Sequence, residues 1–181
     1  MISHRDLTTT NQSIIMPVIY VNDDILSGNY DMIAHQCNCV TRYGKGLYSD
    51  IAKKYPQAHI YPSRQFPSVP GTIVVTEPVI GIMSQFYPGR ANDSDDTSDM
   101  RLKWFREGLK QIAELELGTV AFPFGIGCGL AKGDWKAYEK IIKEFEKSRS
   151  SAKAVVLPVD GTLALSLTPG CVSVVYIVKK C

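Results

Sequence analysis

The chain has 181 residues, of which 45% are hydrophobic and 21% are charged, a composition typical of a globular domain with one core. Lysine and arginine number 20 against 18 aspartates and glutamates, so the chain lacks the basic excess of proteins that bind nucleic acids or anionic membranes. The first fifteen residues have no signal-peptide core, and no apolar run reaches the roughly eighteen residues of a membrane span. We therefore expect a single, monomeric domain without membrane contact, in the cytoplasm or nucleus.

The segment 1–16 is polar and rich in Thr, Ser and Asn, which predicts a flexible N-terminal arm followed by one domain over 17–181. Runs rich in β-branched residues then predict strands, and apolar residues at helical spacing predict helices between them. The predicted strands are Val18–Val21, Met32–Asn38, Thr72–Thr76, Val79–Phe86, Thr119–Phe122, Ala154–Leu157 and Val172–Val178. The predicted helices contain Leu47–Tyr55, then Leu102, Phe105, Leu109 and Ile112, and finally Trp135, Tyr138, Ile141, Ile142 and Phe145.

The alternation of strands and helices predicts an α/β protein in which helices cover both faces of a central sheet. Continuous apolar strands such as Ala154–Leu157 favour this arrangement, and the closely spaced runs Thr72–Thr76 and Val79–Phe86 predict an antiparallel pair within the sheet. The predicted fold is a three-layer α/β/α sandwich with a mixed sheet. The sequence leaves open which run near the C-terminus, Ala154–Leu157 or Val172–Val178, pairs centrally.

Two glycine loops each connect a predicted strand to a predicted helix. Gly125, Gly127 and Gly129 alternate in the first, and Gly44 and Gly46 flank Lys45 in the second. Glycine lets a backbone turn several N–H groups toward one anion at a helix start. Either loop alone is a weak signal, because glycine also marks ordinary turns. Two loops at the same end of a parallel sheet would face each other across a ligand crevice, so the pair favours a site for a diphosphate.

Other clusters of polar residues favour no further site. The segment Asp93–Asp99 has the carboxylate density of a calcium loop but lacks its central glycine and final glutamate, so we expect a solvated, mobile loop. The spacing of His35, Cys37 and Cys39 does not indicate a zinc site, and five cysteines, an odd number, do not indicate a disulfide framework. We expect free, buried thiols, and neither a metal nor a cofactor.

Four motifs occur in order along the chain: Tyr20–Leu26, Ala34–Cys39, Gly44–Leu47 and Gly125–Leu130. As an ordered set over 17–148 they resemble a macrodomain, the ADP-ribose-binding module. The stretch His-Gln-Cys-Asn-Cys, with Gly-Ile-Gly-Cys-Gly-Leu-Ala-Lys-Gly-Asp-Trp later on, is similar to the branch acting on ADP-ribose 1″-phosphate, which includes phage proteins. The resemblance implies a metal-independent hydrolase that binds ADP-ribose and releases phosphate from the 1″-phosphate. Two alternatives stay open: a non-catalytic ADP-ribose reader, and an ADP-ribosyl hydrolase acting on modified protein or nucleic acid.

The resemblance also implies individual roles. Asp24 would accept the adenine amino group with help from the backbone of Ile25, and Asn38 would hold the distal ribose. Apart from the resemblance, Phe86 closes a predicted strand and could stack on adenine. The diphosphate would be wrapped by both loops, which comprise Gly44, Lys45, Gly46, Leu47, Gly125, Ile126, Gly127, Cys128, Gly129 and Leu130. Structural roles are open beside these: Asp24 could form a turn, Asn38 could satisfy a strand end, and Phe86 could simply pack in the core.

His35 is the candidate catalytic residue, because an imidazole can shuttle a proton near neutral pH or attack phosphorus. A hydrogen-bonded core histidine is an equal alternative, since strand alternation would put His35 and Asn38 on opposite faces. Two positions depart from the family pattern. Asp23 stands where the family has glycine, and Ala131 stands where macrodomains that strip ADP-ribose from protein glutamates have aspartate, which disfavours that covalent route.

Overall fold

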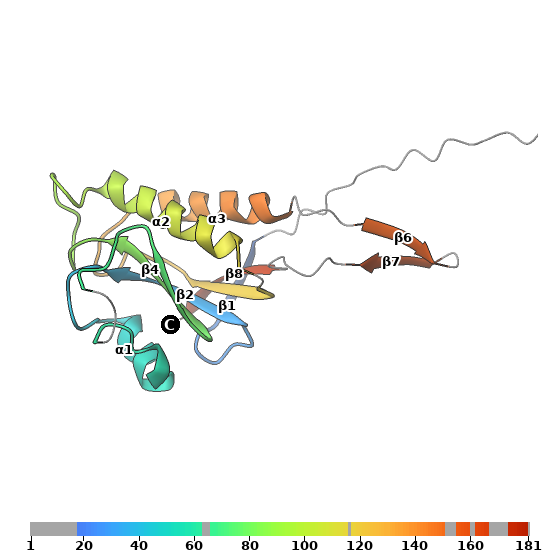
Figure 1. Cartoon of the computed structure of the whole chain (residues 1–181), viewed down its shortest axis with the longest axis horizontal. Coiled ribbons are helices and arrows are strands. Elements are labelled where there is room, and N and C mark those ends of the chain that lie inside the picture. Colours follow the sequence, from blue (N-terminus) through green and yellow to red (C-terminus); the bar gives the residue numbers. More distant parts are fainter. Residues whose placement is uncertain are drawn as a thin grey trace, which may run out of the picture.

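The computed structural model describes residues 18–62, 66–115, 117–150, 155–159, 162–166 and 174–180, and the predicted arm over 1–16 lies outside them. A six-stranded sheet carries helices on both faces, which confirms the expected α/β/α sandwich (Figure 1). The strands are β1 Ile19–Asp24, β2 Met32–Asn38, β3 Ile73–Thr76, β4 Val79–Gln85, β5 Thr119–Pro123, β6 Val155–Val159, β7 Thr162–Ser166 and β8 Val174–Lys180. The helices are α1 Leu47–Lys54, α2 Ser98–Ala113 and α3 Trp135–Ser150, and a 3-10 turn Pro56–Ala58 follows α1.

The strand order in the large sheet is β1-β8-β5-β2-β4-β3, and only β3 is antiparallel to its neighbour. The predicted antiparallel pair is therefore confirmed as β3 and β4, with Ile73 opposite Ile82. The other strands are parallel, so the carboxyl ends of β5, β2 and β4 meet at one edge of the sheet. That edge is where open α/β sheets bind their ligands.

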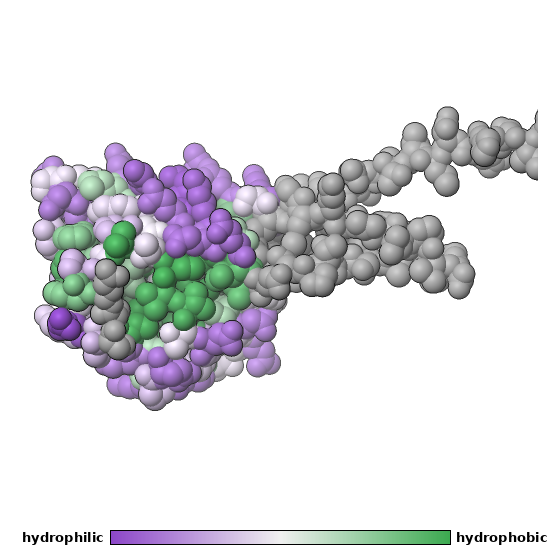
Figure 2. Space-filling view, in the orientation of Figure 1, coloured by the Kyte–Doolittle hydropathy of each residue, from purple (hydrophilic) through white to green (hydrophobic). Residues whose placement is uncertain are grey.

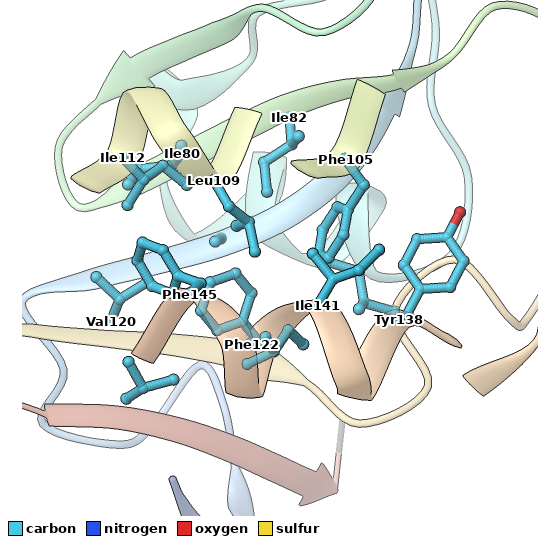
Figure 3. Close-up of a cluster of buried hydrophobic side chains, with 14 of the residues drawn as sticks. Ile80, Ile82, Phe105, Leu109, Ile112, Val120, Phe122, Tyr138, Ile141 and Phe145 are labelled. Carbon is cyan, nitrogen blue, oxygen red and sulfur yellow. The ribbon is translucent and has the colours of Figure 1, made fainter. Parts of the chain in front are cut away.

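Helices α2 and α3 lie side by side on one face of the sheet, and α1 lies on the other (Figure 1). The apolar stripe of α2 meets that of α3, and the Phe105 and Tyr138 ring centres are 5.0 Å apart (Figure 3). Phe122 of β5 belongs to the same cluster, and its ring centre lies 6.1 Å from that of Phe145. On the other face, α1 buries Ile51 completely. Burying each such side chain contributes about 1.5–3 kcal/mol, which is why these short amphipathic segments are helical here.

The C-terminal part of the chain answers the question that the sequence left open. The run Val172–Val178 supplies β8, which lies between β1 and β5. The run Ala154–Leu157 supplies β6, which pairs only with β7, outside the central sheet where we expected such an apolar strand. Val159 pairs with Thr162 in the antiparallel register of these two strands, so they form a hairpin separate from the central sheet.

The rest of the described surface and interior holds few unusual features. Val75, on the edge strand β3, is 42% exposed, and Figure 2 shows an apolar surface over β3 and β4 bordered by hydrophilic residues. Cys37 and Cys39 are buried thiols outside any disulfide, as expected. Within the described ranges, no helix is long and apolar enough to cross a bilayer, and no three His, Cys, Asp or Glu side chains gather as a metal site would require.

Candidate functional site

A cavity of about 600 Å³ opens at the carboxyl ends of β2, β4 and β5, a size typical of small-molecule sites. The β2–α1 loop, with Gly44, Lys45 and Gly46, and the β5–α3 loop both line the cavity. The expectation that the two glycine loops face each other across a crevice is therefore confirmed. Lys45 is the only formally charged residue among the described residues that line the cavity, and no aspartate or glutamate lines it. The cavity suits an anion.

Along the β5–α3 loop, backbone N–H groups that donate hydrogen bonds within the loop alternate with N–H groups that do not. Ile126 donates its backbone N–H to Pro123, and Cys128 donates to Gly125, at 3.0 and 2.8 Å. In the described part of the chain, the N–H groups of Gly125, Gly127 and Gly129 have no acceptor, and all three residues line the cavity. Gly125 and Gly127 have φ values of 72° and 75°, which glycine adopts without strain. Successive N–H groups in such a loop make a concave anion site.

The β2–α1 loop brings the start of α1 to the cavity. Gly46 precedes the helix with φ of 66°, and no side chain caps the helix N-terminus. Gly46 and Leu47 both line the cavity, so the partial positive charge of the helix start acts on it. A side chain at Gly44 would lie 2.3 Å from the Tyr48 ring, so only glycine fits there.

His35 and Asn38 both line the cavity, although regular alternation would separate them. His35 lies against the Tyr48 ring, with ring centres 5.7 Å apart, and Tyr48 packs edge-on against Tyr61. Asn38 donates its side-chain N–H to the Tyr61 hydroxyl at 3.2 Å. The cavity lies at the end of β2 and takes residues from both faces of the strand, since the consecutive residues His35 and Gln36 both line it.

The imidazole of His35 is only 3% exposed and lies 3.6 Å from the Cys37 sulfur. Burial disfavours the charged ring and lowers the pKa of His35 from its ordinary 6.5 to about 4. The ring is therefore neutral at pH 7. A neutral imidazole has a lone pair that can accept a proton or attack an electrophile.

The Asn38 side chain has a clear structural function. Its Oδ1 accepts hydrogen bonds from the Thr41 N–H and hydroxyl at 2.8 and 2.9 Å, and from the Val40 N–H at 3.2 Å. These bonds build the turn that leaves β2. The ribose contact of Asn38 stays a prediction.

Four predicted ligand residues lie outside the cavity lining: Asp24, Ile25, Phe86 and Cys128. Asp24 ends β1 at the same sheet edge, and its Oδ1 accepts the Leu26 N–H at 2.9 Å, as in a turn. The Ile25 side chain is fully buried, and Phe86 packs edge-on against Tyr87. The Cys128 thiol donates to the Ile126 carbonyl, and burial raises its pKa to about 11.

Part of the acidic segment is not solvated, which corrects the sequence expectation. Asp96 is fully buried, pairs with Arg101 at 2.5 Å, and accepts the N–H groups of Phe86 and Tyr87. Arg101 also donates to the Gly89 carbonyl at 2.7 Å. Gly89 lines the cavity, so this buried ion pair holds one of its walls. The sequence carried no signal for the pair beyond an Asp and an Arg near a helix start.

Comparisons with known proteins show the fold. No family model matches the sequence, and no curated protein does. Among solved structures, the macrodomain of Mycobacterium tuberculosis DarG is 17% identical, with a TM-score of 0.62 over 88% of this chain and 96% of that one. The Trypanosoma brucei macrodomain in complex with ADP is 13% identical, with a TM-score of 0.61 over 91% of this chain and 64% of that one. A mutant Oceanobacillus iheyensis macrodomain with ADPR is 12% identical, with a TM-score of 0.50 over 88% of this chain and 82% of that one. The chain has the macrodomain fold.

Proposed function

We propose that the protein binds ADP-ribose in this cavity and hydrolyses ADP-ribose 1″-phosphate to ADP-ribose and phosphate. The observation that carries the proposal is the row of N–H groups at Gly125, Gly127 and Gly129, which line the cavity without acceptors in the described part of the chain. Such a row fits phosphate oxygens. Two proteins of the same fold hold ADP or ADPR, which supports a nucleoside diphosphate as the anion.

The charges of the lining support a ligand that carries a further phosphate. A terminal phosphate adds negative charge to a diphosphate, and a carboxylate nearby would repel it. No carboxylate lines the cavity within the described ranges, while Lys45 and the uncapped start of α1 offer positive charge. The charges of the lining therefore allow the diphosphate and the terminal phosphate to bind together.

The rest of ADP-ribose follows the sheet edge in this proposal. Adenine lies at the end of β1, where Asp24 accepts its amino group and Ile25 contributes its backbone. Asp24 uses only one carboxylate oxygen in its turn, and its other oxygen has no donor among the described residues. The distal ribose lies beside Asn38, and Phe86 supports the wall through core packing.

His35 is the proposed catalytic residue. Its neutral imidazole attacks phosphorus, so that an N–P bond forms while the bond from phosphorus to the 1″ oxygen breaks. The leaving oxygen takes a proton from water and becomes the 1″ hydroxyl of ADP-ribose. A second water then hydrolyses the phosphorylated imidazole, which releases phosphate and restores the neutral ring.

The test is phosphate release from ADP-ribose 1″-phosphate by the purified protein under a chelator, beside His35→Ala. We expect multiple turnovers in the wild type and their loss in the variant. Calorimetry with ADP-ribose runs in parallel, and retained binding shows that the variant is folded. Absence of release by a wild-type protein that binds ADP-ribose would refute the phosphatase assignment.

A non-catalytic ADP-ribose reader is the second candidate. The observation that favours it is the burial of His35, whose ring is 3% exposed and lies against Cys37 and Tyr48. A reader would bind ADP-ribose with the same affinity in the wild type and in a folded His35 variant, and neither would release phosphate.

A further inference from the structure

Two glutamine side chains form the wall of the cavity farthest from β1. Gln36 belongs to β2 and Gln85 ends β4, and both line the cavity. In the strand order, β4 lies beyond β2, on the side opposite β8 and β1. A ligand whose adenine is at β1 and whose diphosphate is at the glycine loops therefore directs its distal end toward this wall. Neither glutamine has a role in the site as described so far.

A chain of hydrogen bonds fixes the orientation of both amides. Gln85 donates Nε2–H to the Tyr87 carbonyl at 2.9 Å, and Arg101 donates to the same carbonyl at 3.2 Å. A carbonyl can only accept, so Nε2 of Gln85 must face it and Oε1 must face Gln36. Accordingly, Gln36 donates Nε2–H to the Gln85 Oε1 at 2.7 Å.

This orientation leaves a spare donor on Gln85. Each amide nitrogen carries two hydrogens, and Gln85 uses one of them in this chain, whereas Gln36 uses one here and also hydrogen-bonds Tyr138. The Oε1 of Gln36 is the unused acceptor, and it is buried without a hydrogen-bond partner beneath Gly127, beside Tyr138. The oxygen that could repel an anion is thus turned into the protein, and the second N–H of Gln85 remains for the cavity.

We propose that Gln85 is a specificity-determining residue that donates to the phosphate on the distal ribose, and that Gln36 is a positioning residue that sets the Gln85 amide. This inference rests on the proposed function, because it names the group that the same cavity recognises. A neutral amide donates to a phosphate whatever the protonation state of the phosphate. Gln85 also places no carboxylate against the phosphate, as a glutamate at this position would.

The test compares Gln85→Met and Gln85→Glu with the wild type for three ligands: ADP, ADP-ribose and ADP-ribose 1″-phosphate. Loss of a hydrogen bond to a charged group weakens binding by roughly tenfold to a hundredfold. We expect Gln85→Met to lose about tenfold in affinity for the 1″-phosphate, and Gln85→Glu to lose more through repulsion. ADP should bind all three proteins with equal affinity. Calorimetry gives these affinities, and the phosphate assay gives kcat and KM.

The control is Gln57→Glu, a matched change at an exposed glutamine that lies outside the cavity lining and donates to the Glu77 carbonyl. Equal losses for all three ligands would overturn the inference, because Gln85 would then support the pocket as a whole. Equal losses for ADP-ribose and its 1″-phosphate would also overturn it, because the sugar would then be the group recognised. If the wild type binds none of the three, the proposed function fails instead, and the two failures are distinct.

Gln36 gives a second readout that a purely structural role would not produce. A side chain at Gly127 would lie 2.6 Å from the Gln36 Oε1, so Gln36 lies against the β5–α3 loop. Gln36 therefore supports two features, this loop and the Gln85 amide. We expect Gln36→Met to weaken ADP and ADP-ribose 1″-phosphate together, but the second ligand by about tenfold more. Equal weakening would show that Gln36 supports the loop alone, and would contradict the role in setting Gln85.

Discussion

The burial of His35 predicts a measurable loss of stability in acid. The folded protein holds the pKa of His35 at about 4, whereas an unfolded chain has the ordinary 6.5. Below pH 6.5 the unfolded state therefore binds the proton more tightly than the folded state. The contribution of His35 to the unfolding free energy is complete above pH 6.5 and is lost as the pH falls toward 4. The difference between the two pKa values corresponds to about 3 kcal/mol of unfolding free energy.

The assay is urea unfolding of the wild type and His35→Asn at a series of pH values from 7.5 to 4.5. Carboxylates titrate in both proteins, so the difference between the two curves isolates the contribution of His35. We expect the unfolding free energy of the variant to rise, relative to that of the wild type, by about 1.4 kcal/mol for each pH unit below 6. Parallel curves would refute the reasoning, because His35 would then be protonated as readily in the folded protein as in the unfolded chain.

Three substitutions test the loops and the buried ion pair. A side chain at Gly129 meets no atom within 4 Å, so Gly129→Glu should fold normally yet weaken ADP-ribose binding at least tenfold in calorimetry, while the uncharged Gly129→Gln loses less. Gly127→Ala should instead lower the unfolding free energy by more than about 1 kcal/mol in urea, because its φ is 75° and the new carbon would lie 2.6 Å from the Tyr138 ring. Arg101→Met should cost about 3–5 kcal/mol in the same assay by leaving Asp96 buried and unpaired, and the surface control Arg106→Met less than about 1 kcal/mol. Equal binding by the two Gly129 variants, or losses for Arg101→Met no larger than for Arg106→Met, would contradict these assignments.

The features that the sequence predicted are those with local physical causes. Alternating glycines between a strand and a helix indicated the loop that lines the cavity, because few other residues adopt φ near 75°. Periodic apolar residues indicated all three helices. The burial of Asp96 could not be predicted in this way, since its partner Arg101 lies five residues on and the pair is buried only once α2 packs on the sheet. The choice of Val172–Val178 over Ala154–Leu157 for the central sheet likewise depends on competition between two similar runs for one position.

The placement of Gln85 depends on a single irregularity that has no local signal. Cys37 pairs with Met83, and Asn38 pairs with Gln85, so Ser84 has no partner across the strands. The extra residue in β4 shifts the register by one at the point where β2 reaches the cavity. An unbroken ladder would instead set Ser84 opposite Asn38 and turn Gln85 to the other face of the sheet. The same shift sets Gln85 opposite Asn38 at the end of the strand pair. One unpaired residue therefore sets the proposed specificity residue beside the predicted ribose contact at one cavity.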